Sequence, residues 1–184
     1  MKFRFLLLTT LTAALSAAAF AQSSINPSHL SLRTGTGIDR MPVTSDTAIT
    51  PAAVRALEKD TFQLINTERA LAGLSPLRWS DKIADVARLH SANMADYNFF
   101  SHKGLDGLMV DDRAAQLKMG AWRAIGENIA FMKGYENPVG VAVEKWLQSA
   151  GHKKNLLNPD WTETAIGLAV TPDGKYYFTQ VFIR

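Results

Sequence analysis

The sequence predicts an α+β domain built as a three-layer α-β-α sandwich, in which a small antiparallel sheet lies between helices. Apolar residues recur at helical spacing over the first half of the domain, and strand-like segments separated by turn residues occupy its end. Helices that precede, separate and follow strands can cover both faces of one sheet. The chain contains no cysteine, so its core must hold it together without disulfides.

The first 21 residues have the features of a secretory signal peptide. Lys2 and Arg4 give a basic start, residues 5–15 are apolar, and small residues lead to Ala21. Threonines interrupt the apolar stretch, which is shorter than the roughly 20 residues of a bilayer span. We expect cleavage after Ala21, which gives a secreted protein, extracellular or periplasmic, with no transmembrane segment after signal removal.

Residues 22–50 form the predicted leader and residues 51–184 the predicted domain. The leader is dense in Ser, Thr, Gly and Pro, and its apolar residues follow neither helical nor strand spacing. This composition is typical of a flexible spacer.

The domain is expected to open with two long helices. The first begins at Pro51, because Thr50 is a good N-cap and proline suits the first turn, and it closes at Gly73. The second follows Ser80 as N-cap and ends by Asn98. The remaining expected elements are helices over residues 110–118 and 138–148 and extended segments over residues 125–131, 164–170 and 175–183.

The charge balance argues against nucleic acid as a partner. The full chain has 20 Lys and Arg against 17 Asp and Glu, but the signal removes Lys2 and Arg4 and leaves 18 basic residues. A mature net charge of +1 does not provide the basic surface that nucleic acid requires.

Three polar residues stand at element boundaries, where site residues are commonly carried: His102, Glu127 and His152. Two imidazoles and a carboxylate suit a divalent metal, with zinc the first candidate. Each residue also has a plain structural interpretation: a loop histidine bonded to backbone, a turn cap, and a solvent-facing residue at the start of a short helix. Their spacing of 25 residues is not a metal motif, and no GxSxG, HExxH, GxxxxGK or GxGxxG pattern occurs.

Two further polar residues are expected inside the fold. His90 lies on the apolar side of the second helix and is interpreted as a buried or half-buried structural histidine. Arg69 is expected either to pair with an acid or carbonyl inside the fold or to lie on a solvated helix face.

The domain resembles the CAP superfamily of cysteine-rich secretory proteins, venom antigens and pathogenesis-related proteins, in its bacterial, cysteine-free branch. The order and spacing of several short segments carry the resemblance. They are residues 66–69 (NTER), 73–77 (GLSPL), 100–102 (FSH), 126–130 (GENIA), 151–157 (GHKKNLL) and 177–182 (YFTQVF), together with Trp146.

The resemblance implies an α-β-α sandwich with a surface cleft of two histidines and two glutamates that can bind a divalent metal. Matched by motif, His102 and His152 are the histidines and Glu127 is one glutamate. Ser149 stands where many relatives have the other glutamate. A catalytic zinc site needs three ligands and a base, so the loss of one carboxylate makes a hydrolase the less favoured interpretation.

The predicted function is therefore an extracellular or envelope binding module with a polar cleft, whose ligand is a small molecule, a lipid or an envelope component. One alternative is a secreted hydrolase in which Glu127 is catalytic, and another is a structural envelope protein. A lipid ligand would need an apolar channel. Residues 105–110 (LDGLMV) are a candidate wall for it, although such a run is more often core.

Overall fold

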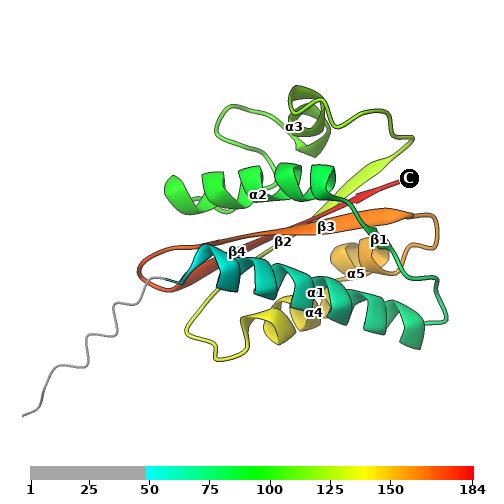
Figure 1. Cartoon of the computed structure of the whole chain (residues 1–184), viewed down its shortest axis with the longest axis horizontal. Coiled ribbons are helices and arrows are strands. Elements are labelled where there is room, and N and C mark those ends of the chain that lie inside the picture. Colours follow the sequence, from blue (N-terminus) through cyan, green and yellow to red (C-terminus); the bar gives the residue numbers. More distant parts are fainter. Residues whose placement is uncertain (1–48) are drawn as a thin grey trace, which may run out of the picture. The chain divides into compact units, whose positions relative to one another are not determined.

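The computed structural model describes residues 49–184, so the predicted signal peptide and nearly all of the predicted leader lie outside the described residues. Five helices and four strands make up this part of the chain (Figure 1). In order they are α1 (Pro51–Leu71), β1 (Arg78–Trp79), α2 (Asp81–Asp96), α3 (Val110–Gln116), β2 (Ile125–Lys133), α4 (Pro138–Gln148), α5 (Ala150–Leu156), β3 (Glu163–Val170) and β4 (Lys175–Ile183).

The four strands form one sheet in the order β1-β3-β4-β2. The pairs β3–β4 and β2–β4 are antiparallel, which confirms the predicted sheet. The two-residue β1 was not predicted, and it pairs with β3 in parallel. Because β4 pairs on both sides, the strand that follows all the others along the chain lies inside the sheet.

Helices cover both faces of the sheet, as the three-layer prediction requires. Figure 1 shows α2 and α3 on one face and α1, α4 and α5 on the other. A separate hydrophobic core fills each interface. The core under α1, α4 and α5 contains Ile65, Ala130, Met132, Ala142, Val143, Trp146, Leu156, Ile166, Leu168 and Phe178. The core under α2 and α3 contains Ile83, Ala84, Val86, Ala87, Ala114, Met119, Ala165 and Val181.

The helix starts follow the predicted capping with one difference. The Thr50 hydroxyl accepts a hydrogen bond from the Ala53 amide at 3.2 Å, which confirms the cap of α1. Ser80 stands before α2 as predicted, but its side chain makes no capping bond. Asp81, the first residue of α2, instead accepts from Trp79 Nε1 at 2.8 Å.

Arg69 is fully buried and satisfies carbonyl groups, which confirms the first of its two interpretations. Its guanidinium donates to the carbonyl oxygens of Ser75 (3.1 Å), Leu156 (2.8 Å) and Asn158 (2.9 Å). These bonds tie the end of α1 to the end of α5. The arginine thereby fixes the position of the helix that carries His152.

Helix α2 lies very close to β3 at Gly167. A Cβ atom at this position would overlap the main chain of Ala87 and Arg88 in α2, so only glycine fits. The Ser91 hydroxyl donates to the Gly167 carbonyl at 2.9 Å and closes the same contact. Helix α2 is therefore a rigid support for the loop that follows it.

Candidate functional site

The structure brings the three predicted residues together. His102, in the loop between α2 and α3, and His152, in α5, have ring centroids 6.3 Å apart. Both histidines line a hollow of about 380 Å³ above β2. The full lining is Phe100, Ser101, His102, Lys103, Met109, Ile129 and His152.

Glu127 lies beneath this hollow and orients His102. Its side chain is 4% exposed, and its Oε1 atom is 2.8 Å from His102 Nδ1. A carboxylate accepts hydrogen bonds, so Nδ1 is the donor in this contact, and in the neutral ring Nε2 then has a free lone pair. The side chain of His102 is 43% exposed, so the contact with Glu127 holds a ring that remains accessible from the surface.

Arg113, which the sequence analysis missed, holds Glu127 from the other side. Its guanidinium donates to Glu127 Oε2 at 2.6 Å and also to the carbonyl oxygens of His102 (3.2 Å) and Leu108 (2.9 Å). Only 2% of its side chain is exposed. Arg113 therefore links α3 to β2 through a buried ion pair with Glu127, and to the loop of His102 through hydrogen bonds to carbonyl oxygens.

His152 is held through its main chain. Asn128 Nδ2 donates to the His152 carbonyl at 3.1 Å, and Asn155 Nδ2 donates to Glu127 O (3.1 Å) and Asn128 Oδ1 (3.0 Å). Partial burial lowers the pKa of His152 below its usual range, and the nearby His102 lowers it further. His152 is therefore neutral at pH 7 and can accept a hydrogen bond or bind an ion.

His90 supports the loop from below and is fully buried, as predicted for a structural histidine. Its Nε2 atom lies 2.9 Å from the Ser101 carbonyl oxygen, so this nitrogen is the donor. Burial lowers the pKa of His90. The neutral ring thereby fixes the residue next to His102.

Ser149 and the 105–110 segment complete the predicted set. Ser149 lies between α4 and α5, three residues before His152, and is not among the residues that line the hollow. Met109 does line it and is 42% exposed, while Leu105 is 69% exposed. Part of the predicted apolar wall therefore borders the site.

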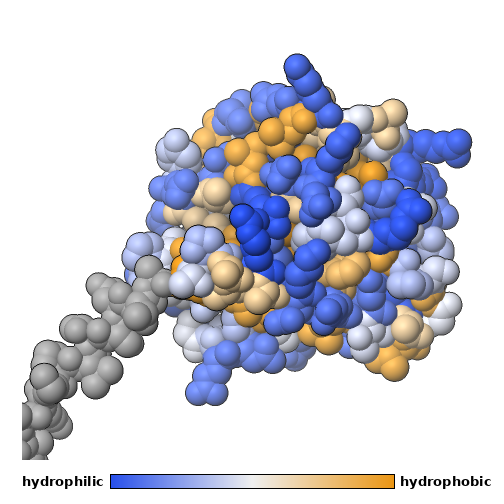
Figure 2. Space-filling view, in the orientation of Figure 1, coloured by the Kyte–Doolittle hydropathy of each residue, from blue (hydrophilic) through white to orange (hydrophobic). Residues whose placement is uncertain are grey.

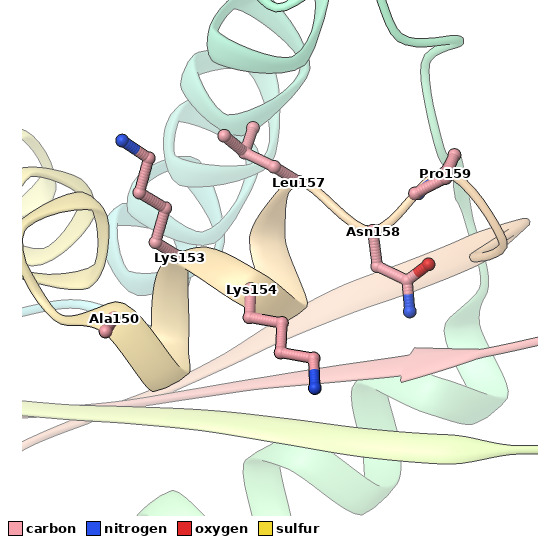
Figure 3. A pocket seen from close by; sticks show the side chains of 6 residues that line it. All are labelled: Ala150, Lys153, Lys154, Leu157, Asn158 and Pro159. Carbon is pink, nitrogen blue, oxygen red and sulfur yellow. The ribbon is translucent and has the colours of Figure 1, made fainter.

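A larger hollow of about 570 Å³ lies on the exposed side of α5 and contains none of the predicted residues. Figure 3 shows Lys153 and Lys154 extending from α5 in different directions, with Leu157 at the end of the helix and Pro159 on the segment that follows. Ala150 and Asn158 complete the lining of this larger hollow, which therefore contains no acidic or imidazole side chain. The smaller hollow is the candidate site because the positioned polar groups converge there.

Comparison with protein families gives a match to CAP, the cysteine-rich secretory protein family, over residues 62–182. The chain belongs to the CAP family. All three predicted cleft residues lie inside the matched range.

Two relatives from Bacillus subtilis share this CAP region. The "uncharacterized protein YkwD" is 36% identical over 140 residues, which cover 76% of this chain and 52% of YkwD. The "uncharacterized membrane protein YlbC" is 40% identical over 127 residues, which cover 69% of this chain and 34% of YlbC. The chain thus spans about half the length of YkwD and about a third of YlbC.

Solved structures confirm the predicted fold. An extracellular protein containing a SCP domain from Bacillus anthracis superposes with a TM-score of 0.61 at 37% identity, covering 74% of this chain and 44% of that one. An outer surface protein from Borrelia burgdorferi gives a TM-score of 0.64 at 22% identity, covering 71% of this chain and 94% of that one. At 22% identity, the similarity to the Borrelia burgdorferi protein concerns the fold alone.

No helix between residues 49 and 184 has the length and apolar character needed to cross a bilayer. The face of this CAP domain seen in Figure 2 has hydrophobic patches separated by hydrophilic side chains.

The groups of this CAP cleft that could bind an ion are its two imidazoles. Both oxygens of Glu127 are bound by Arg113 and His102. The remaining candidate ligand atoms for an ion are His102 Nε2 and the ring nitrogens of His152. Two imidazoles on one zinc place their centroids roughly 5 to 6 Å apart, close to the 6.3 Å observed here. Within residues 49–184 no group of three or more His, Asp or Glu side chains gathers as a metal site. The histidine pair alone would hold such an ion, which could polarise an anionic or carbonyl oxygen of a ligand.

Proposed function

We propose that the chain is an exported CAP binding module whose cleft at His102 and His152 recognises a ligand at the cell envelope. The buried pair of Arg113 and Glu127 is the observation that carries this proposal. Burying two charges costs free energy that apolar residues of similar volume would not cost, so the pair is a poor choice for stability alone. It holds His102 in one tautomer and one direction, as a recognition site needs.

The lining of the cleft indicates the chemistry of its ligand. One part offers imidazole nitrogens and the ammonium group of Lys103, which has no ion-pair partner among the described residues. The other part consists of Phe100, Met109 and Ile129. A ligand with a polar or anionic group next to an apolar one fits both parts. The extracellular relative from Bacillus anthracis supports a location outside the cytoplasm.

The ligand proposal is tested with isolated bacterial cell envelopes. The chain without its predicted signal, residues 22–184, is expected to cosediment with envelopes, and the double variant His102→Ala, His152→Ala is expected to lose most of this binding. The control is His29→Ala, which removes a histidine of the predicted leader and should bind like the wild type. Equal binding by all three proteins would contradict the proposed role of the cleft.

Zinc titration by calorimetry tests whether the module is metal-assisted. We expect weak binding at one ion per chain, lost in the double variant and kept in His29→Ala, since two nitrogen ligands give a low-affinity site. If the wild type releases or absorbs no heat on addition of zinc, the proposal loses its metal and the cleft is a metal-free recognition site.

A hydrolase is the second candidate function, because a carboxylate that orients a histidine is also the arrangement of a general base. This geometry gives Nε2 of His102 the role of base and Glu127 the role of orienting group. Any hydrolysis should then disappear in His102→Ala, which leaves the buried pair intact, as well as in Glu127→Gln. Activity that survives both changes would exclude this candidate. A purely structural protein would tolerate replacement of all three cleft residues.

A further inference from the structure

Strand β2 is an edge strand whose far half has free main-chain groups. Its partner is β4, and no other strand of residues 49–184 pairs with it. Just before β2, Ala124 and Arg184 exchange both main-chain bonds, at 3.1 and 3.3 Å. Antiparallel pairs alternate, so even-numbered residues of β2 bond to β4 and odd-numbered residues direct their N–H and C=O groups away from it.

Side chains occupy the first part of this outer edge. Asn155 Nδ2 donates to the Glu127 carbonyl at 3.1 Å, and Trp146 Nε1 donates to the Ile129 carbonyl at 2.9 Å. No hydrogen bond within residues 49–184 reaches the outward main-chain groups of Phe131 or Lys133. The helices therefore satisfy the edge beside the cleft and leave it open beyond the cleft.

An exposed aromatic surface accompanies the open part of the edge. Phe131 is 39% exposed and Phe100 is 50% exposed, with ring centroids 6.0 Å apart. Tyr177 supports Phe131 from β4 at 4.9 Å. Glu127, Ile129 and Phe131 alternate along β2 and share one face, so this surface continues from the floor of the cleft over about 13 Å.

We propose that the free end of β2 binds an extended peptide as an added strand, and that the same peptide enters the cleft. This inference rests on the proposed binding function and names its ligand class. A polypeptide backbone supplies N–H and C=O groups at the spacing that the outward groups of Phe131 and Lys133 require, which a lipid or a glycan does not. A second copy of the chain could also pair through this edge, and sedimentation distinguishes it from a peptide.

The geometry also predicts the side-chain pattern of the peptide. The residue opposite Phe131 faces the cleft side of the sheet, so an aromatic or large aliphatic side chain there would pack on Phe100 and Phe131. Two residues along, towards the cleft, the next side chain on this face reaches the hollow that Ile129 and Lys103 both line. An acidic side chain or a terminal carboxylate complements the charge of Lys103.

Selection from a phage-displayed library of random hexapeptides on residues 22–184 tests this pattern. Enriched peptides are expected to carry an aromatic or large aliphatic residue and an acidic group two positions apart. Absence of enrichment, or enrichment without this spacing, would overturn the inference.

Main-chain pairing is tested on the selected peptides with two variants of one residue. Lys133→Pro removes an outward amide without removing a bond to β4, and we expect it to weaken binding about tenfold. Lys133→Ala keeps the amide and should bind within about twofold of the wild type. Circular dichroism checks that both variants fold. N-methylation of the peptide is independent of protein folding, and it should abolish binding only at alternate positions.

The outcomes separate this inference from the proposed function. Peptides that require His102 and His152 but are insensitive to Lys133→Pro and to N-methylation would overturn strand addition and keep the cleft. If peptide binding is weakened by Lys133→Pro but is unchanged in the double variant His102→Ala, His152→Ala, the proposed role of the cleft is contradicted. Sedimentation should show a monomer, and a dimer dispersed by Lys133→Pro would assign the edge to a second copy and overturn the inference.

Discussion

Replacing Arg113 by methionine is expected to lower the free energy of unfolding by about 3–5 kcal/mol. The side chains of Arg113 and Glu127 are only 2% and 4% exposed, so water cannot solvate the carboxylate once the guanidinium is gone. Methionine fills much of the same volume, which limits the contribution of a cavity. The variant also frees the carbonyl oxygens of His102 and Leu108, which lose their donor.

Urea unfolding of four proteins isolates the ion-pair contribution: the wild type, Arg113→Met, Glu127→Gln and the double variant. In the Glu127→Gln background the buried guanidinium of Arg113 has lost its carboxylate partner, so Arg113→Met no longer strands a charge. Its added cost should fall to about 1–2 kcal/mol or less, set by the lost bonds to carbonyls. A cost below about 1 kcal/mol for Arg113→Met alone would refute the reasoning. Strictly additive costs would also refute it, because they would mean that the two charges do not interact.

Two other changes test the packing and the buried histidine. Gly167→Ala should lower the free energy of unfolding by about 3 kcal/mol or more, because the added Cβ would overlap the main chain of Ala87. Gly151→Ala is the control: this position in α5 has open space around it, so alanine should raise the free energy of unfolding by up to about 1 kcal/mol. Similar effects in urea unfolding would contradict the close contact of α2 with β3. The folded pKa of His90 is lowered, so its stabilisation is complete above about pH 6.5 and declines as pH falls towards the folded pKa. His90→Gln, which keeps a donor for Ser101, should flatten this decline between pH 7 and 5, and an unchanged slope would argue against a neutral buried ring.

The sequence was most informative where local chemistry decides the structure. Helix α1 starts at Pro51 behind Thr50 as predicted, and α4 (Pro138–Gln148) has the predicted bounds. The pairing of β2 with β4 follows from the whole topology, and no local pattern reveals it. The two residues of β1 are too few for alternation to be visible.

The site was predicted in part for the same reason. His102, Glu127 and His152 stood out as polar residues at element boundaries, and the family resemblance related them to one another. Arg113 follows two aspartates and has the composition of a solvated helix face, yet α3 turns it inward onto Glu127. Only tertiary packing decides that orientation, so the partner that fixes Glu127 could not be deduced.

The central position of β4 has a consequence for the order of events during synthesis. Neither β2 nor β3 has a long strand partner until β4 has been made, although both precede it along the chain. The buried contact between Glu58 and the Leu168 amide spans 110 residues and must also wait. Such long-range topology slows folding, so the domain remains unfolded while most of it is being made. If the chain is exported, as we propose, it would benefit from that delay, because a narrow translocation channel admits only an unfolded chain.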